Sequence, residues 1–427
     1  MLMEAKMVIE GGRKLNGEVE ISGSKNACLP IFAATLLTDE PCRIMGVPKL
    51  RDIKTMSEIL VLLGKKIQAN KDTVTIASTN RCSFVANYEQ VKTMRASFCV
   101  LGPLLAKAKK AEVSYPGGCV IGDRPIDIHL RGLEELGAKI TTDSGYVIAR
   151  APKLKGNYVY LSGHFGSSVT GTANVMMAAT LAQGKTVIEG AACEPEVVDL
   201  ANFLIKMGAQ INGHDTSMIK VNGVKKLHGV DYRIIPDRIE ASTFILAALI
   251  TKGDLVIKNV NVHHLGVVLD CLKKIGAHID IGNNKLRVAF KNTLKPINVT
   301  TLPYPGFPTD MQAQFASLMC LTPGVSIITE KVFPDRFMHI PELSRMGARI
   351  HREGASAIVE GVKSLSGAPV MASDLRASAS LVLAGLAAKG KTSISRIYHL
   401  ERGYENLDKK LIGLGAKIWK ESINYIA

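Results

Sequence analysis

The chain has 427 residues, which is enough for two or three domains with full cores. Lysine and arginine number 53 against 38 aspartates and glutamates, so the formal net charge is +15. A hydrophobic content of 47% with 21% charged residues indicates a globular protein and excludes a disordered one. No apolar run reaches the roughly 18 residues of a membrane span, and residues 1–12 lack a signal-peptide pattern, so we expect a cytoplasmic protein.

A five-residue motif recurs six times: an apolar residue, Gly, two variable residues and Ile. Its glycines stand at positions 64, 137, 208, 276, 347 and 415, at spacings of 73, 71, 68, 71 and 68 residues. A glycine just past a helix end supplies the left-handed conformation needed there, and the segment after it is typical of a strand. The motif therefore predicts six similar units along the chain.

Each unit contains further elements in the same order. A strand is expected over residues 8–22, before the first helix. Every unit then has a helix rich in small residues and apolar nearly all round, which indicates burial. These helices are expected at residues 26–37, 95–106, 172–182, 240–250, 312–321 and 376–388. Strands that follow a glycine, such as 184–188 and 253–257, come next, and an amphipathic helix ends at the repeated motif.

These elements predict an α/β fold of β-α-β-α-β-β units, with the small-residue helices buried inside and the sheets facing outward. Six units divide naturally into two domains of three. We expect one domain at residues 25–233, and the other at residues 1–24 and 234–427. The strand over 8–22 is expected to pair in the C-terminal domain.

The eight cysteines are scattered and form no Cys-x-x-Cys pair, which argues against a zinc site and against a disulfide framework. Seven are expected to be buried small apolar residues. Cys119 differs, because it lies among Gly117, Gly118 and Gly122 and close to Arg124. A cation lowers the pKa of a nearby thiol, so Cys119 is a candidate nucleophile or proton donor. The alternative is a buried structural thiol.

Cations recur at equivalent loop positions of the six units, beside helix N-termini whose free N–H groups also attract anions. They are Lys25, Arg95, Arg124, Arg336, Arg376 and Arg402. As a set they predict a site for phosphate or carboxylate groups, whereas taken singly each is an ordinary surface cation. Asp310 is either a helix N-cap or a base facing these cations, where it would stay ionised.

With these residues in view, the chain resembles the UDP-N-acetylglucosamine 1-carboxyvinyltransferases, a family of enolpyruvyl transferases within the EPSP synthase-like superfamily. The resemblance extends from Leu15 to about Tyr404. It rests on the stretches SGSKNACLPI, PGGCVIGDRPIDIHL, FPTDMQAQF, DLRASASLVLAG and ERGYE. It implies two inside-out α/β barrels of three repeats each, with the active site in the cleft between them.

The resemblance implies transfer of enolpyruvate from phosphoenolpyruvate to the 3-hydroxyl of UDP-N-acetylglucosamine, through a tetrahedral ketal and with release of phosphate. This reaction is the first committed step of peptidoglycan synthesis. Lys25 and Asn26 match the phosphoenolpyruvate pair, Cys119 the proton donor that also forms a covalent adduct, and Asp310 the aspartate at the sugar hydroxyl. The other implied substrate contacts are Arg95, Arg124, Pro125, Ile126, Asp127, Ile128, Gly166, Ser167, Ser168, Val169, Val332, Arg376 and Arg402.

The chain departs from the family at Gly166–Val169, where a lysine is common and this sequence has none. No metal or cofactor is implied, because arginine and lysine neutralise the anions. We expect a monomer whose partners are the two small substrates, with no nucleic acid and no membrane span.

Three alternative functions are distinguished by sequence features. A shikimate-branch enolpyruvyl transferase shares the fold and donor but would lack the loop of Cys119. A nucleic-acid-binding repeat protein fits the charge of +15 but has too few aromatic residues for stacking on single strands. A catalytically silent relative is disfavoured by the intact Cys119, Asp310 and Lys25.

Overall fold

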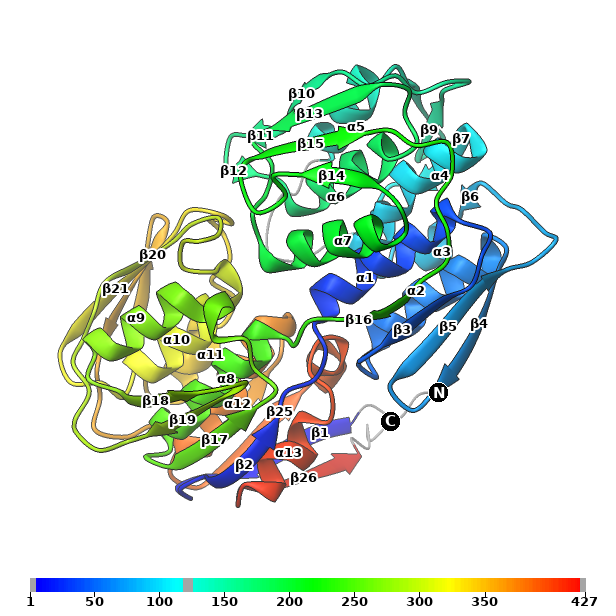
Figure 1. Cartoon of the computed structure of the whole chain (residues 1–427). Helices are drawn as coiled ribbons and strands as arrows, with labels where there is room; N and C mark the ends of the chain where they lie inside the picture. Colours follow the sequence, from blue (N-terminus) through cyan, green and yellow to red (C-terminus); the bar gives the residue numbers. More distant parts are fainter. Residues whose placement is uncertain (1–4, 118–125, 423–427) are drawn as a thin grey trace. The chain divides into compact units, whose positions relative to one another are not determined.

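The structure is a computed structural model that describes residues 5–117 and 126–422 of the chain. The described residues divide into two compact units (Figure 1). One comprises residues 23–117 and 126–235 and is called here the 23–235 unit. The other comprises residues 5–22 and 236–422 and is called the 236–422 unit. Each unit has its own hydrophobic core.

The 23–235 unit contains three four-stranded sheets and one small hairpin within its described residues. The first sheet has the order β16 (Asp231–Arg233), β3 (Cys42–Met45), β5 (Thr73–Ser78), β4 (Lys65–Asn70). The second has the order β6 (Val85–Ala86), β7 (Lys110–Ser114), β9 (Tyr146–Arg150), β8 (Lys139–Asp143). The third has the order β10 (Tyr158–Tyr160), β13 (Lys185–Glu189), β15 (Met218–Asn222), β14 (Gln210–Asn212). The hairpin pairs β11 (Ser162–Gly163) with β12 (Gly166–Ser167).

The 236–422 unit also contains three four-stranded sheets within its described residues. The first has the order β18 (His278–Gly282), β19 (Lys285–Ala289), β17 (Asp254–Lys258), β2 (Asn16–Glu20). The second has the order β20 (Val299–Thr301), β21 (Val325–Glu330), β23 (Ser356–Glu360), β22 (Arg349–Glu353). The third has the order β24 (Pro369–Met371), β25 (Lys391–Ser395), β1 (Ala5–Glu10), β26 (Lys417–Ser422).

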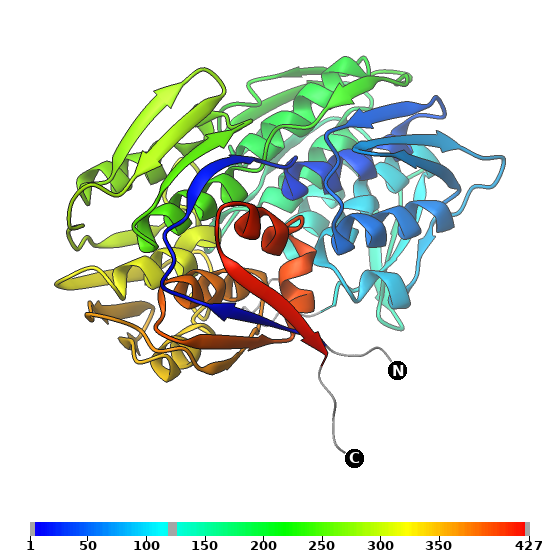
Figure 2. The same cartoon turned by 90° about the horizontal axis from the view of Figure 1, so that it is seen from below.

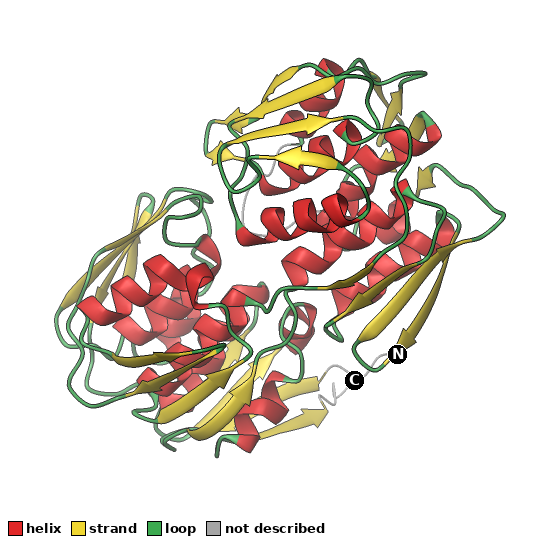
Figure 3. Cartoon of the chain, viewed as in Figure 1, coloured by secondary structure: helices red, strands yellow, loops and turns green. Residues whose placement is uncertain are grey.

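All six of these sheets share one pairing plan. One edge strand runs parallel to its neighbour, and the other two pairings are antiparallel. The protein is therefore an α/β protein with mixed sheets, as the order of elements predicts. Figure 3 shows the helices of each unit flanked by its sheets.

α-Helices and short 3₁₀ turns lie beside these sheets. Those of the 23–235 unit are α1 (Lys25–Ala34), α2 (Arg51–Leu62), α3 (Tyr88–Val91), α4 (Leu101–Ala108), α5 (Asp127–Glu135), α6 (Val169–Ala179) and α7 (Pro195–Lys206), with 3₁₀ turns η1 (Thr35–Leu37) and η2 (Arg95–Val100). Those of the 236–422 unit are α8 (Arg238–Ile250), α9 (Gly266–Lys274), α10 (Gln312–Met319), α11 (Ile340–Arg345), α12 (Leu375–Ala387) and α13 (Leu407–Gly413), with η3 (Val262–Leu265), η4 (Thr309–Met311) and η5 (Ile397–Arg402).

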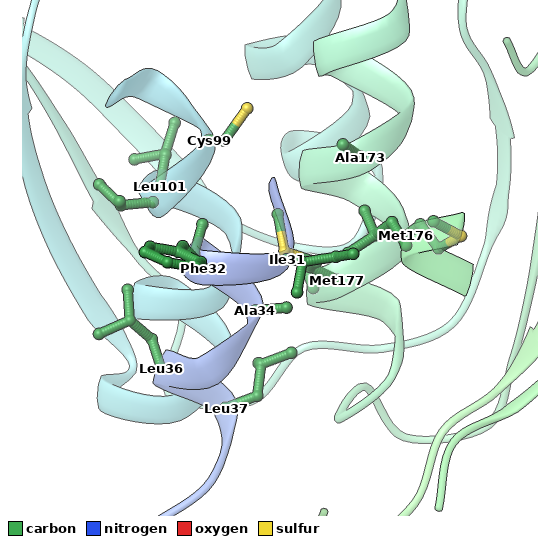
Figure 4. Close-up of a cluster of buried hydrophobic side chains, with 14 of the residues drawn as sticks. Ile31, Phe32, Ala34, Leu36, Leu37, Cys99, Leu101, Ala173, Met176 and Met177 are labelled. Atoms are coloured by element: carbon green, nitrogen blue, oxygen red, sulfur yellow. The ribbon is translucent and has the colours of Figure 1, made fainter. Parts of the chain in front are cut away.

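The small-residue helices are buried, as predicted. Every residue of α8 from Ile239 to Ile250 is buried, and so is every residue of α6 from Gly171 to Ala179. Figure 4 shows apolar side chains of α1, including Ile31 and Phe32, in one cluster with those of α6. Small side chains let these helices pack closely on all sides, because Ala and Gly take up little space and neighbouring backbones can approach them. In the part of the chain that the structure describes, every helix is too short or too polar to span a bilayer.

The repeated glycine occupies the predicted helix end in all six copies. Its φ angle is positive each time, between 89° and 102°, and a strand begins one or two residues later. A residue with a Cβ pays a steric penalty in this conformation, which explains the glycine. The prediction from the motif is confirmed.

Two sequence expectations need correction. The single strand over 8–22 is two strands, because Gly11 packs against the backbone of Ala388 and Gly12 has a φ of 84°, so the chain turns between β1 and β2. Both strands pair with C-terminal elements, as expected, and Figure 2 shows β1 beside the C-terminal strand β26. Of the seven cysteines expected to be buried, Cys82 is exposed and Cys193 is half-buried, since both lie in connecting segments.

The helix-end glycines support a paired stability test. Gly276 has a φ of 95° and open space where an added methyl group would lie, whereas Gly413 is helical with equally open space. Gly276→Ala should lower the melting temperature, because a left-handed Ala costs about 1–2 kcal/mol. Gly413→Ala should raise it, since Ala is favoured over Gly in a helix by up to about 1 kcal/mol. Melting curves followed by circular dichroism check this, and shifts of the same sign would refute the conformational explanation.

Candidate active site

In the 236–422 unit, Asp310 lies between two arginines. Its Oδ1 accepts a hydrogen bond from Arg336 Nη1 at 2.8 Å, and its Oδ2 accepts one from Arg376 Nη2 at 2.8 Å. The arginine side chains are 8% and 4% exposed, and that of Asp310 is 26% exposed. Both guanidinium groups therefore bind the same carboxylate in a nearly buried place, and the buried Asp374 and Asp237 also act electrostatically on Arg336 and Arg376, respectively.

The ionisation of Asp310 follows from these contacts. Burial raises the pKa of its carboxyl, but the charges of Arg376 and Arg336 and their hydrogen bonds outweigh burial and hold the pKa well below its usual range. Asp310 is therefore a carboxylate at neutral pH. The alternative role of helix N-cap is wrong, because Asp310 sits inside η4 and no side-chain cap hydrogen bond forms at η4 or α10.

Arg376 is held on its other side by Tyr404. The guanidinium carbon lies 5.3 Å from the centre of the Tyr404 ring. The Tyr404 hydroxyl accepts a hydrogen bond from Gln314 Nε2 at 3.1 Å and shares one with Thr243 Oγ1 at 2.9 Å. Tyr404 thereby connects α8, α10 and α12 near their N-terminal ends, where Arg376 is the second residue of α12.

Other predicted residues of this unit lie on neighbouring segments. Val332 follows β21, and its backbone N–H donates to the Glu330 carboxylate at 2.9 Å. Arg402 is the last residue of η5, two residues before Tyr404. Asp237 and Asp374, at equivalent places of two repeats, are N-caps of α8 and α12, with side chains that accept backbone N–H bonds. The aspartates before the buried helices therefore have two roles. Asp237 and Asp374 cap helices, whereas Asp310 accepts hydrogen bonds from two arginines.

In the 23–235 unit, Lys25 and Asn26 form the first turn of α1, and Ser24 caps this helix. The Lys25 ammonium lies 3.0 Å from the carboxylate of Asp52, and both side chains are nearly buried. Asn26 is partly exposed next to it. The pairing with Asp52 keeps a charged lysine at the N-terminus of a buried helix, where an isolated cation would be costly.

The segment from Ile126 to Ile128 begins α5 and meets the segment of Gly166–Val169. Gly166 and Ser167 form β12, Ser168 caps α6, and Val169 is the first residue of α6. A Cβ at Gly163 or Gly171 would lie 2.6 Å or 3.2 Å from side-chain atoms of Ile128, so these glycines make room for that residue. The structure thus brings together two segments that are about 40 residues apart in the sequence.

Buried polar groups fix the start of α5. His129 Nδ1 is 2.8 Å from Asn174 Nδ2, and His129 Nε2 is 3.1 Å from Thr170 Oγ1. Burial, reinforced by the charge of Arg95, lowers the pKa of His129 to about 3, so its ring is neutral. Asp127 is exposed and Arg95 is partly exposed, at the starts of α5 and η2.

Cys119, Arg124 and Pro125 lie outside the residues that the structure describes. Of the six predicted cations, Arg336 and Arg376 share one carboxylate, and Lys25 has a carboxylate of its own. Sequence reasoning missed these partners, namely the pairing of Lys25 with Asp52 and the contacts of Tyr404 and Glu330. A single acidic residue at the end of a strand without other charged residues, such as Glu330 on β21, is the signal that could have identified one of them.

The buried arginines make the stability of this cluster testable. Asp310→Asn should lower the melting temperature, because two buried guanidinium groups lose their counter-charge at a cost of about 2–3 kcal/mol. Asp335→Asn is the matched control, since Asp335 pairs with Arg352 at 2.7 Å but is 70% exposed; it should shift the melting temperature little.

The difference between wild type and Asp310→Asn should also depend on pH. Because folding lowers the pKa of Asp310, its contribution is complete above the unfolded pKa of about 3.9 and is lost as pH falls through the folded pKa. Melting curves from pH 7 to pH 3 should therefore converge only below about pH 4. Convergence at higher pH would contradict the strong ion pairs.

Comparison with known proteins shows to which family the chain is similar. The family profile of EPSP synthase (3-phosphoshikimate 1-carboxyvinyltransferase) matches residues 9–411. The UDP-N-acetylglucosamine 1-carboxyvinyltransferase of Methylacidiphilum infernorum is 54% identical over 97% of this chain and 98% of its own length. UDP-N-acetylglucosamine 1-carboxyvinyltransferase 2 of Carboxydothermus hydrogenoformans is 53% identical over 98% of this chain and 99% of its own.

Solved structures are similar over the whole chain. The enolpyruvyl transferase NikO from Streptomyces tendae has a TM-score of 0.90 and 25% identity, covering 99% of this chain and 100% of that one. An EPSP synthase from Acinetobacter baumannii, at 19% identity, has a TM-score of 0.78 over 98% of this chain and 100% of its own, which shows the fold alone. The chain belongs to the EPSP synthase family of enolpyruvyl transferases.

Proposed function

We propose that this protein is an enzyme that transfers enolpyruvate from phosphoenolpyruvate to the 3-hydroxyl of UDP-N-acetylglucosamine and releases phosphate. The observation that carries the proposal is the 54% identity, over 97% of the chain, to an enzyme named UDP-N-acetylglucosamine 1-carboxyvinyltransferase. This reaction is the first committed step of peptidoglycan synthesis.

In the addition step, the sugar 3-hydroxyl oxygen bonds to C2 of phosphoenolpyruvate. Asp310, which is ionised, accepts the hydroxyl proton. The C2=C3 double bond breaks, and its electrons take a proton at C3 from the thiol of Cys119. The result is a tetrahedral ketal that carries both the sugar oxygen and the phosphate on C2.

In the elimination step, the Cys119 thiolate left by the addition takes a proton from C3, the double bond reforms, and the C2–O bond to phosphate breaks. The proton that Asp310 took from the sugar hydroxyl leaves with the phosphate group, so both residues return to their starting state. The departing group is inorganic phosphate, and its negative charge is offset by cations. The position of the nearly buried Arg376 beside the proposed base Asp310 supports this role for Arg376. Arg402, two residues before Tyr404, is a second cation at the phosphoenolpyruvate end of the proposed site.

The 23–235 unit supplies the remaining contacts in this proposal. Lys25 and Asn26 hold phosphoenolpyruvate at the start of α1, and Arg95 contacts substrate. The nucleotide-sugar contacts are Arg124, Pro125, Ile126, Asp127, Ile128, Gly166, Ser167, Ser168 and Val169, together with Val332 of the other unit. The packing of Ile128 beside Gly163 and Gly171 supports a common surface for most of these residues.

We also propose a finer description of the fold. Residues 25–233 form one inside-out α/β barrel of three β-α-β-α-β-β repeats, and residues 1–24 with 234–427 form a second. The shared pairing plan of the six sheets and the buried small-residue helices support this description. Residues of both barrels act on the same pair of substrates.

One assay tests the function directly. Phosphate release from phosphoenolpyruvate is measured with no acceptor, with UDP-N-acetylglucosamine, and with 3-phosphoshikimate. Release only with the UDP-sugar supports the proposal. Release with 3-phosphoshikimate instead would favour the activity for which the matching family is named.

Cys119→Ser should lower turnover by about 10²–10⁴ while the melting temperature stays unchanged, because a serine hydroxyl is a far weaker acid than a thiol beside a cation. Cys119→Asp should retain activity and resist thiol alkylation, because a carboxyl can also donate a proton. Turnover of Cys119→Ser at the wild-type level would contradict the proton-donor role.

Asp310→Asn should lower kcat by about 10²–10⁴ with little change in the dissociation constant of the UDP-sugar, because an amide keeps the shape but takes no proton. The assay is run below the melting temperatures of both proteins, with Asp335→Asn as the control of unchanged kcat. A near-normal kcat would restrict Asp310 to holding the two arginines.

A further inference from the structure

Glu330 is a buried carboxylate whose two oxygens both accept hydrogen bonds. It is the last residue of β21 and is completely buried. Oε1 accepts hydrogen bonds from Thr301 Oγ1 at 2.6 Å and from the backbone N–H groups of Val332 and Phe333, both at 2.9 Å. Oε2 accepts one from Thr309 Oγ1 at 2.8 Å.

One of these four bonds comes from Thr301 on β20, and the other three hold two further segments at the same point. The first segment is the turn after β21, where both N–H groups that reach Glu330 lie at or beside Val332. The second is the start of η4, where Thr309 immediately precedes Asp310. A buried carboxyl group that accepts four hydrogen bonds is a rigid anchor, because each of the four donors restricts its position.

Thr309 carries this anchor to Asp310. Its hydroxyl donates to Glu330 and accepts from Arg336 Nη1 at 3.1 Å. The same nitrogen of Arg336 donates to Asp310 Oδ1 at 2.8 Å. One continuous chain of hydrogen bonds therefore runs from Val332 through Glu330, Thr309 and Arg336 to Asp310.

We propose that Glu330 is a positioning residue that sets the Asp310 carboxylate in register with the segment of Val332, acting through the hydroxyl of Thr309. This inference rests on the proposed function, in which Val332 contacts the nucleotide and Asp310 receives the sugar proton. Glu330 touches neither substrate. Its effect is on the distance and angle at which the bound sugar hydroxyl meets its base.

Two threonines allow the proposal to be separated from a merely structural role. Thr309 and Thr301 each donate one hydroxyl hydrogen bond to Glu330, and each hydroxyl also accepts one N–H. For Thr309 that N–H belongs to Arg336, which holds Asp310, whereas for Thr301 it is the backbone N–H of Lys331. Valine has nearly the shape of threonine, so each substitution removes the hydroxyl and little else.

Thr309→Val should lower kcat by about 10–100-fold, the range expected for a misplaced catalytic group, with the KM for UDP-N-acetylglucosamine changed less than about threefold. Thr301→Val should leave kcat within about twofold of wild type, although it removes the same kind of bond from the same carboxylate. Thr309→Ser keeps the hydroxyl and should restore kcat to within about threefold. Melting temperatures are recorded for all three variants.

Equal kcat values for Thr309→Val and Thr301→Val, or no rescue by Thr309→Ser, would overturn the positioning role. If either valine variant fails to fold, Thr309→Ala and Thr301→Ala replace the pair under the same criteria. Wild-type protein that releases no phosphate with the UDP-sugar overturns the proposed function itself. If the wild type is active and Thr309→Val and Thr301→Val have equal kcat values, only the role of Glu330 is overturned.

Discussion

Two buried guanidinium groups around one carboxylate set the main constraint on the 236–422 unit. Removing a charge from water is costly unless it is paired, so Arg336 and Arg376 require Asp310 where it is. That requirement ties together η4, the first turn of α12 and the turn that follows β21. Glu330 and Tyr404 then hold the two outer sides of the cluster.

The same arrangement poses a question about basicity. A carboxylate whose pKa is held well below its usual range is reliably ionised but accepts a proton weakly. In the proposed reaction, the anionic phosphoenolpyruvate competes with Asp310 for the charge of Arg376, and this competition raises the basicity of the Asp310 carboxylate. In the proposed reaction, the arginines keep Asp310 ionised in the free enzyme, and binding of phosphoenolpyruvate makes Asp310 a stronger base.

Local features of the chain were predictable, whereas pairings between distant residues were not. The glycine at each helix end and the burial of α6, α8 and α12 follow from residues close in sequence, and both predictions are confirmed. Asp310 is equally suited by sequence to a helix cap, because its partners lie 26 and 66 residues away. The break between β1 and β2 depends on the packing of Gly11 against Ala388, a contact that no local pattern reveals. The repeat positions and the glycine-rich loop identified Cys119, Asp310 and the six cations as candidates, and the resemblance to a family supplied the other candidate site residues. The structure added Glu330, Tyr404 and Asp52.

The central claim is that the two arginines keep Asp310 ionised, and its direct test is a carbon-13 NMR titration of aspartate carboxyl groups. The Asp310 signal is assigned by its loss in Asp310→Asn. The account predicts a chemical shift that stays constant from about pH 7 to about pH 4.5, because the pKa lies well below 3.8. A signal whose titration, continued to lower pH, has its midpoint at or above 3.8 would contradict this claim.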